Sequence, residues 1–196
     1  MSRPGHGDEV VGLMDRAARH LARGDAAGAA REAARAKTLA ARSPAVREML
    51  GLALYEQERY REALSEMQAY RRMSGRVDQN HIIADCERAV GRPERAVPLA
   101  EEALSARIRP EVKAEAVIVA ASALADAMRF EQALALLHRF RTRDDVAEPY
   151  ILRVWYVTAD VLARAGRRDE ARRQFGKILR HDARAFDVAE RLAQLG

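Results

Sequence analysis

Cysteine is almost absent from this sequence, since Cys86 is the only one among 196 residues. A single cysteine excludes an internal disulfide and any metal site built from several thiolates. Cys86 lies in a predicted helix beside Ile82, Ile83 and Val90, so we interpret it as a buried structural thiol.

Long apolar runs are also lacking. No stretch of about 18 apolar residues occurs, and the start, Met1 to Asp8, has no apolar core of the kind that a secretory signal carries. These absences predict a soluble, cytoplasmic protein that does not associate with a membrane. Strand signals are missing as well: there is no sustained alternation and no Asn-Gly or Asp-Gly turn between β-branched runs. The sequence therefore predicts an all-α protein.

Motifs for catalysis are poor. No glycine-rich phosphate loop and no Gly-x-Ser-x-Gly sequence occurs. The five histidines form no metal-ligand pair with another part of the chain: His6, His20, His81, His138 and His181. His81 and Asp85 lie four residues apart on one helix face, which suits a shared hydrogen bond or two metal ligands, but a surface pair is the simpler interpretation. We expect no enzyme, no cofactor and no metal.

Arginine and alanine are abundant instead. Arginine outnumbers lysine by 31 to 3, which together with the alanine content indicates a GC-rich bacterial genome. The net charge of +5 and the isoelectric point near 9.8 leave a nucleic acid or an acidic partner open. A solvated, arginine-rich surface explains the same excess, and we prefer that interpretation.

Alanines recur with a long period, and a helix-turn precedes each of them. The gaps between them are 34, 33, 37 and 38 residues: Ala29, Ala63, Ala96, Ala133 and Ala171. A period of this size indicates a stack of helical hairpins, none of which buries its apolar face alone. We expect a tail at 1–8, a repeat domain at 9–181 and a capping helix at 182–196. The expected units are about 9–41, 44–75, 77–106, 110–141 and 148–180.

These units resemble tetratricopeptide repeats. In the second unit Leu50-Gly51 and Tyr60-x-x-Ala63 match the pattern of that family, and Trp155, Ala171 and Phe175 match it in the fifth. The resemblance implies a right-handed superhelix, or solenoid, of about five hairpins with a C-terminal capping helix. It also implies a scaffold or adaptor that binds an extended or helical segment of another protein.

In this family the first helix of each hairpin lines the concave face of the superhelix. Carried over by position, the resemblance implies a partner-binding groove made of ten residues: Glu48, Leu52, Tyr55, His81, Asp85, Arg88, Ser122, Asp126, Tyr156 and Asp160. Acids outnumber arginines on these helices, so we expect an acidic groove and a basic partner segment with an apolar or aromatic anchor. The Lys and Asn that some repeats use to clamp a terminal carboxylate are absent.

Two other functions stay open. Nucleic acid would bind through the arginines of the second helices, on the convex face, and through the stretch from His138 to Arg143. Self-association would use an end of the stack or the groove, with the chain a monomer or a weak homo-oligomer. Few aromatic residues, 5% of the chain, and acids interleaved with the arginines disfavour nucleic acid.

Overall fold

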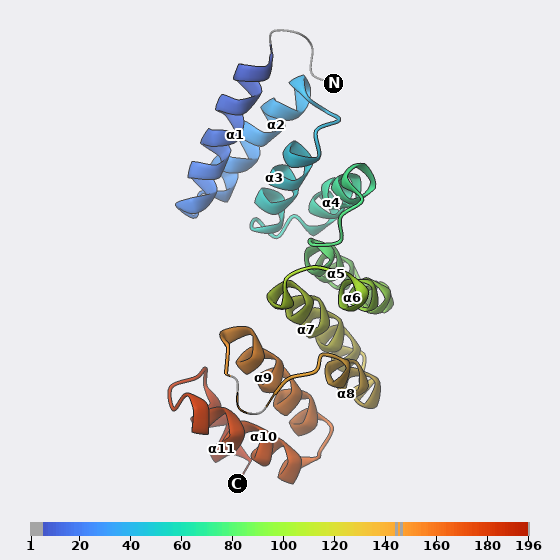
Figure 1. Cartoon of the computed structure of the whole chain (residues 1–196), viewed down its shortest axis with the longest axis vertical. Coiled ribbons are helices and arrows are strands. Elements are labelled where there is room, and N and C mark those ends of the chain that lie inside the picture. The colour runs from blue at the N-terminus through green and yellow to red at the C-terminus, as the bar shows by residue number, and fades with distance from the viewer. Residues whose placement is uncertain (1–5, 144, 146, 196) are drawn as a thin grey trace. The chain divides into compact units, whose positions relative to one another are not determined.

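The computed structural model describes residues 6–143, 145 and 147–195, in which it has eleven α-helices and one short 3-10 helix. No strand occurs in that part of the chain, and the predicted all-α class is confirmed. The helices divide into two compact units. Unit 1 ends at Gly91 and unit 2 begins at Arg92 (Figure 1).

Unit 1 contains five helices that pack against their neighbours in chain order. They are α1 (Gly7–Ala22), α2 (Ala26–Leu39), α3 (Pro44–Tyr55), α4 (Tyr60–Ser74) and α5 (Asn80–Ala89). The first helices also meet one another, α1 with α3 and α3 with α5. This is the packing expected for hairpins whose first helices lie side by side.

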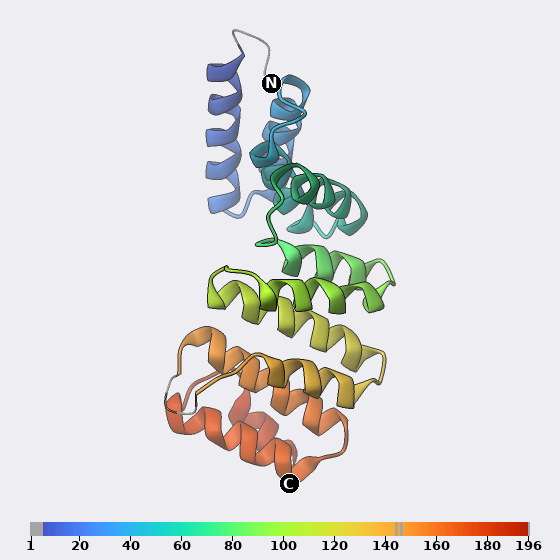
Figure 2. The same cartoon turned by 45° about the vertical axis from the view of Figure 1, so that its right-hand side comes forward.

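Unit 2 repeats the arrangement. It contains the 3-10 helix η1 (Pro93–Arg95) and then α6 (Ala96–Ser105), α7 (Pro110–Asp126), α8 (Phe130–Arg139), α9 (Pro149–Arg164), α10 (Arg168–His181) and α11 (Val188–Gln194). Figure 2 shows α7 beside α6 and α9 beside α10, and α7 also contacts α8 and α9. The longer gaps in the alanine period have a plain cause: α7 has 17 residues and α9 has 16, against 12 in α3 and 10 in α5.

Local sequence explains where many of these helices begin. Pro44, Pro110 and Pro149 occupy the first turn of α3, α7 and α9, where a missing N–H costs nothing and the fixed φ suits a helix. Asp25 caps α2, because its carboxylate accepts a hydrogen bond of 2.7 Å from the amide of Gly28. These signals place the elements that carry the candidate site.

The turn inside each expected hairpin has one residue in the left-handed region. The spacing of these residues is the same as that of the alanines: Gly24, Glu58, Gly91, Met128 and Gly166. In four of the turns the next amide donates to the carbonyl five residues earlier, at 2.9–3.0 Å: Asp25 to His20, Arg59 to Leu54, Arg129 to Leu124 and Arg167 to Leu162. Such a bond closes a helix end and sets the direction of the following helix.

Close helix packing depends on small residues, as the sequence predicts. The five recurring alanines are fully buried, and so are Ala84, Ala121 and Ala159 on first helices. Gly51 is buried at the matching position of α3, where an added Cβ would lie 3.0 Å from Met67. Larger side chains fill the remaining space: Met67, Leu124, Trp155 and Phe175 are buried, and Tyr60 and Phe130 are half-buried.

The ends of the chain differ from the expected ranges. Residues 1–5 of the expected tail lie outside the described residues, and α1 already begins at Gly7. The closing helix was expected from residue 182, but α11 begins at Val188, after a turn in which Phe186 has a φ of 51°. Phe186 lies in the left-handed region, which the interior of a helix does not use, so α11 begins only after this residue.

Candidate functional site

The ten residues of the expected groove fall into two sets, one in each unit. Unit 1 holds six of them, on α3 and α5: Glu48, Leu52, Tyr55, His81, Asp85 and Arg88. Unit 2 holds four, on α7 and α9: Ser122, Asp126, Tyr156 and Asp160. Because all four helices are first helices of their hairpins, each set lies on one first-helix face.

In unit 1 hydrogen bonds join α3 to α5 across this face. The Tyr55 hydroxyl donates to Asp85 Oδ2 at 2.7 Å, and Gln79 Nε2 donates to Glu48 Oε1, also at 2.7 Å. Arg88 pairs with the same Asp85 at 2.8 Å from its own helix. Three of the six predicted residues are therefore brought into direct contact, and their positions are fixed by one another.

Burial changes the titration of two residues in this set. Burial and the hydrogen bond to Asp85 raise the pKa of Tyr55 above its ordinary value, so its hydroxyl stays a donor at neutral pH. Burial lowers the pKa of His81, which keeps this imidazole neutral. Within the described residues His81 and Asp85 share no hydrogen bond, and Asp85 bonds to Tyr55 and Arg88.

In unit 2 the chain itself covers much of the predicted set. Arg164 pairs with Asp126 at 3.1 Å and with Asp160 at 3.8 Å, and Arg191 of α11 also pairs with Asp160. The Tyr156 hydroxyl donates to Asp187, and the ring of Phe186 lies 5.0 Å from the Tyr156 ring. The segment that leads into α11 therefore occupies the surface around Tyr156.

The carboxylates of both sets are thus bonded within their own unit. Counting acids and arginines along the sequence overstates the negative field, because the opposing charges lie next to each other. Arg191, Asp187 and Gln79 were missed as members of these faces. The signal that finds them is a separation of about one repeat, since three of the bonds join residues 31 apart: Glu48–Gln79, Tyr156–Asp187 and Asp160–Arg191.

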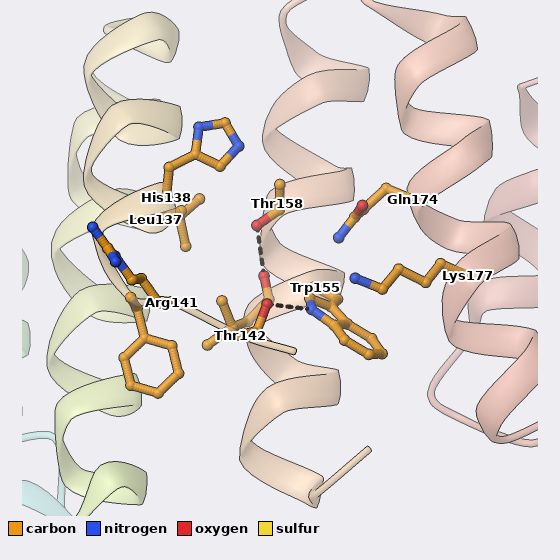
Figure 3. A pocket seen from close by; sticks show the side chains of 10 residues that line it. Leu137, His138, Arg141, Thr142, Trp155, Thr158, Gln174 and Lys177 are labelled. Carbon is orange, nitrogen blue, oxygen red and sulfur yellow. Dashed lines mark hydrogen bonds between the residues drawn. The ribbon is translucent and has the colours of Figure 1, made fainter. Parts of the chain in front are cut away.

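The second-helix side of unit 2 has a pocket of about 510 Å³ between α8, α9 and α10. Trp155, 2% exposed, forms its floor and donates from Nε1 to Thr142 Oγ1 at 3.0 Å. The ammonium of Lys177 lies 3.6 Å from the centre of the Trp155 ring. Figure 3 shows Arg141 and Lys177 on opposite sides of the pair formed by Thr142 and Trp155.

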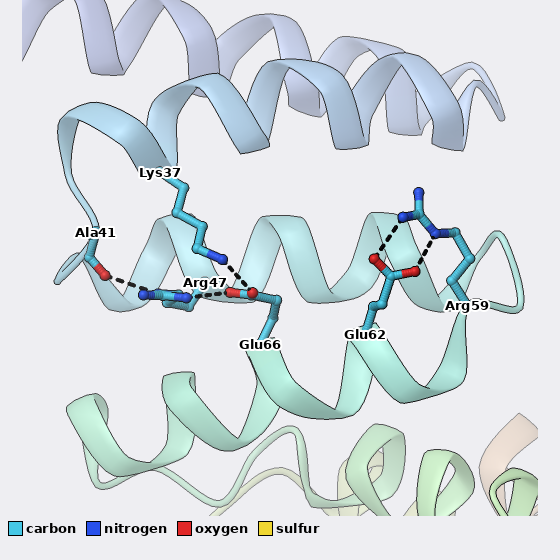
Figure 4. Close-up of polar contacts among 6 residues, drawn as sticks. All are labelled: Lys37, Ala41, Arg47, Arg59, Glu62 and Glu66. Carbon is cyan, nitrogen blue, oxygen red and sulfur yellow. Dashed lines mark hydrogen bonds and ion pairs between the residues drawn. The ribbon is translucent and has the colours of Figure 1, made fainter.

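The second-helix side of unit 1 has a buried ion cluster. Glu66 of α4 is 7% exposed and accepts from Lys37 of α2 at 2.6 Å and from Arg47 of α3 at 2.7 Å. Arg47 also donates to the carbonyl of Ala41 at 2.9 Å. Figure 4 shows both cations converging on Glu66, whereas Glu62 pairs with Arg59 at the exposed start of the same helix. The cluster ties three helices together.

Two further features were looked for among the residues that the structure describes: a cluster of metal ligands and a helix that could span a bilayer. Among those residues no group of three or more His, Cys, Asp and Glu side chains is placed to hold a metal ion. In the same part of the chain no helix combines the length and the apolarity that crossing a bilayer requires.

Helical hairpins that stack on their neighbours define the class of helical-repeat proteins. The chain belongs to the tetratricopeptide repeat family: the family described as Tetratrico peptide repeat matches residues 82–183, just over half of the chain. Proteins with this fold generally mediate protein–protein interaction and are typically scaffolds without enzymatic activity.

Solved structures agree with this fold at low sequence identity. The MamA protein is similar with a TM-score of 0.70 and 16% identity, over 96% of each chain. YrrB, described as a TPR protein with an unusual peptide-binding site, has a TM-score of 0.65 and 17% identity, over 93% of this chain and 90% of its own. A thermophilic TPR protein of Thermus thermophilus has a TM-score of 0.63 and 19% identity, over 95% of this chain and 98% of its own. A comparison with curated proteins gives no match.

Proposed function

We propose that the chain is an interaction scaffold that binds an extended or helical segment of a partner protein on a first-helix face. The face of unit 1 is the better candidate. One observation carries this choice: the bonds Tyr55–Asp85 and Gln79–Glu48 hold α3 and α5 side chains in place before any partner arrives. A surface that is already ordered loses less entropy on binding. The peptide-binding site described for YrrB supports the same use of the fold.

The chemistry of this face favours a segment that carries hydrogen-bond donors and one apolar anchor. Glu48 and Asp85 offer carboxylate oxygens, and Leu52 and Tyr55 are half-buried between them. A Lys or Arg side chain of the partner would compete with Arg88 for Asp85, so charge alone gives modest affinity. We therefore assign most of the binding energy to Tyr55 and Leu52, and orientation to the acids.

The corresponding set in unit 2 is a weaker candidate. Tyr156 and Asp160 already bond to Asp187 and Arg191, so a partner would have to displace part of the chain. Only Ser122 and Asp126 lie away from that segment.

Nucleic acid is not proposed as a second function, because many second-helix arginines face acids of the same unit. Arg139 pairs with Glu101, and Arg167 pairs with both Glu131 and Glu170. Phosphates would have to replace these carboxylates.

Selection from a library of random short peptides tests the proposal. We expect the selected peptides to carry Lys or Arg beside an aliphatic or aromatic residue. Tyr55→Ala should lower their affinity about tenfold, as expected for a central anchor, and Asp85→Asn should lower it by a smaller factor. Arg168→Glu, an exposed change on α10, is the matched control and should leave binding unchanged. Selected peptides that are acidic, or that bind the Tyr55→Ala variant as tightly as the unsubstituted protein, would contradict the proposal.

A further inference from the structure

A segment at the edge of unit 2, which we call the closing segment, covers the first-helix face around Tyr156. It spans residues 183–195 and contains α11 with the turn before it, and Figure 1 shows α11 beside α10. The Tyr156 hydroxyl of α9 donates to Asp187 of this segment at 2.5 Å. Arg191 of the segment pairs with Asp160 of α9. One sequence that fits this face is therefore known, because the chain supplies it.

Burial anchors the closing segment at two points. Val188 is fully buried and Ala185 is 7% exposed, whereas the ring of Phe186 is still 53% exposed. Arg172 of α10 adds a hydrogen bond of 2.6 Å to the carbonyl of Leu195. Contacts of this kind join one surface to another, so a segment of identical sequence from a second copy makes the same ones.

The connection between α10 and α11 is strained and weakly closed. Phe186 has a φ of 51°, in the left-handed region, where a Cβ lies close to a carbonyl oxygen. The amides of Ala185 and Val188 donate to carbonyls three residues earlier, at 3.2 and 3.4 Å. The bonds that close four of the hairpin turns are shorter, at 2.9–3.0 Å, and hence stronger. A short connection under strain favours the exchange of an end element between copies, because opening releases the strain.

The charges of the face do not depend on the closing segment. Asp160 also pairs with Arg164, one turn further along α9, at 3.8 Å. The side chains of Arg191 and Asp160 are 27% and 29% exposed, so water reaches both of them. The closing segment can therefore leave the face without stranding a buried charge.

We propose that two copies of the chain exchange their closing segments, so that the segment of each copy covers the first-helix face of unit 2 in the other. The exchanged dimer has the same contacts as the closed monomer, and the connection is no longer confined to a tight turn. A short connection gives the segment an effective concentration of about millimolar within its own chain, so the monomer predominates at low concentration. This use of unit 2 is independent of the binding face proposed for unit 1.

Charge reversal across the face tests the exchange. In the closed chain Asp160→Arg sets two arginines against each other, and Arg191→Asp sets two aspartates against each other. In a mixture of these two variants, exchanged segments restore an opposite pair on both faces. Native mass spectrometry and sedimentation velocity should show a heterodimer in the mixture. Its association constant should be at least about tenfold above that for self-association of either variant.

Two controls accompany this experiment. Glu115 of α7 pairs with Arg153 of α9, and both residues lie outside the closing segment. A mixture of Glu115→Arg with Arg153→Glu should therefore give no heterodimer. The double variant Asp160→Arg with Arg191→Asp restores an opposite pair within one chain and should stay monomeric at the same concentration as the unsubstituted protein.

A longer connection tests the strain without touching the face. An insertion of about four glycine and serine residues after Ala183 relaxes the turn of the closed monomer. It should lower the association constant of the otherwise unsubstituted protein about fivefold or more, as measured by sedimentation equilibrium.

Three results of the mixing experiment would overturn the proposal. In the first, amide hydrogen exchange shows α11 released in both single variants, but their mixture stays monomeric. In the second, α11 stays protected in both variants, which means that it is a fixed cap. In the third, the Glu115→Arg and Arg153→Glu mixture also dimerises, which means unspecific association. If a charge-reversed variant does not fold, the insertion decides. An association constant that the insertion leaves unchanged, or no dimer of the unsubstituted protein near millimolar concentration, would then refute the exchange.

Discussion

At the scale of single residues, the five hairpin turns solve one backbone problem with different side chains. Three have glycine at the left-handed position, but Glu58 and Met128 adopt φ values of 58° and 60°. The left-handed region brings a Cβ close to a carbonyl oxygen, which costs free energy that glycine avoids. Met128 is 72% exposed, so its side chain gains little contact in return.

Met128→Gly should therefore stabilise the protein by about 0.5–1 kcal/mol, measured by chemical denaturation. Met128→Ala is the matched control, because alanine keeps the Cβ and should bring no gain. Equal effects of the two changes would mean that the Met128 side chain, and not its backbone, sets the energy.

Two other glycines have opposite surroundings. Gly51→Leu should destabilise by about 1–3 kcal/mol, because a Cβ there already lies 3.0 Å from Met67. Gly176 lies within α10, where an added Cβ meets only the end of Arg180 at 3.9 Å. Gly176→Ala should stabilise by about 0.5–1 kcal/mol through helix propensity. A melting temperature that stays constant or rises in Gly51→Leu would contradict the packing of α3 on α4, and one that falls in Gly176→Ala would contradict the open surroundings of Gly176.

At the scale of elements, the ion cluster at Glu66 joins three helices of unit 1. Glu66→Gln leaves Lys37 and Arg47 facing each other without a counter-charge, and we expect a loss of about 1–3 kcal/mol in the free energy of unfolding. Glu62→Gln removes an exposed pair one turn earlier on α4 and should have a much smaller effect. Denaturation curves of the two variants measure this difference. Equal losses in the free energy of unfolding would mean that the cluster adds nothing to the packing of α2, α3 and α4.

The helices and their pairing could be predicted because many positions carry the same signal. An alanine recurs five times at the same place, and each one is fully buried. The start of α11 could not be predicted in this way. It depends on Phe186 in the left-handed region, a conformation that is uncommon for phenylalanine and that its presence in the sequence does not predict.

The candidate site was predictable only in part, for the same reason. Family positions place Tyr55 and Asp85 on facing helices, and the structure brings them together. The pairing of Asp160 with Arg191 depends on where α11 begins, so the sequence alone did not predict a partner for the Asp160 carboxylate. The pocket at Trp155 depends on the path of the α8–α9 loop, which no repeat position specifies.

At the scale of the whole molecule, tyrosine hydroxyls and a thiol that keep their protons in the folded state make the free energy of unfolding fall at high pH. Burial raises the pKa of the Tyr70 and Tyr156 hydroxyls to about 12, as do their hydrogen bonds to Asp78 and Asp187, and burial raises the pKa of the Cys86 thiol to about 12. In the unfolded chain these groups titrate near 10 and 9, so that state loses its protons first. Stability is therefore full below about pH 9 and declines up to about pH 12.

Denaturant midpoints measured between about pH 8 and pH 11 check this expectation, with tyrosinate absorbance recorded beside them. Tyr70→Phe removes one of the titrating groups and should make the decline shallower. A midpoint that stays constant over this range would show that the hydroxyls are not held by the fold.

The bonds between successive first helices also bear on how the molecule comes apart. In a repeat array, hairpins unfold together when the interface energy is large compared with the energy of one hairpin, and separately when it is small. Tyr55–Asp85, Asp126–Arg164 and Asp160–Arg191 all belong to interfaces, since each joins one first-helix position to the next helix on the same face. The two ion pairs among them weaken with ionic strength, whereas the buried alanine packing does not. The cooperativity of unfolding within unit 2 should therefore decrease as salt is added, with hairpins at its edge fraying before the rest.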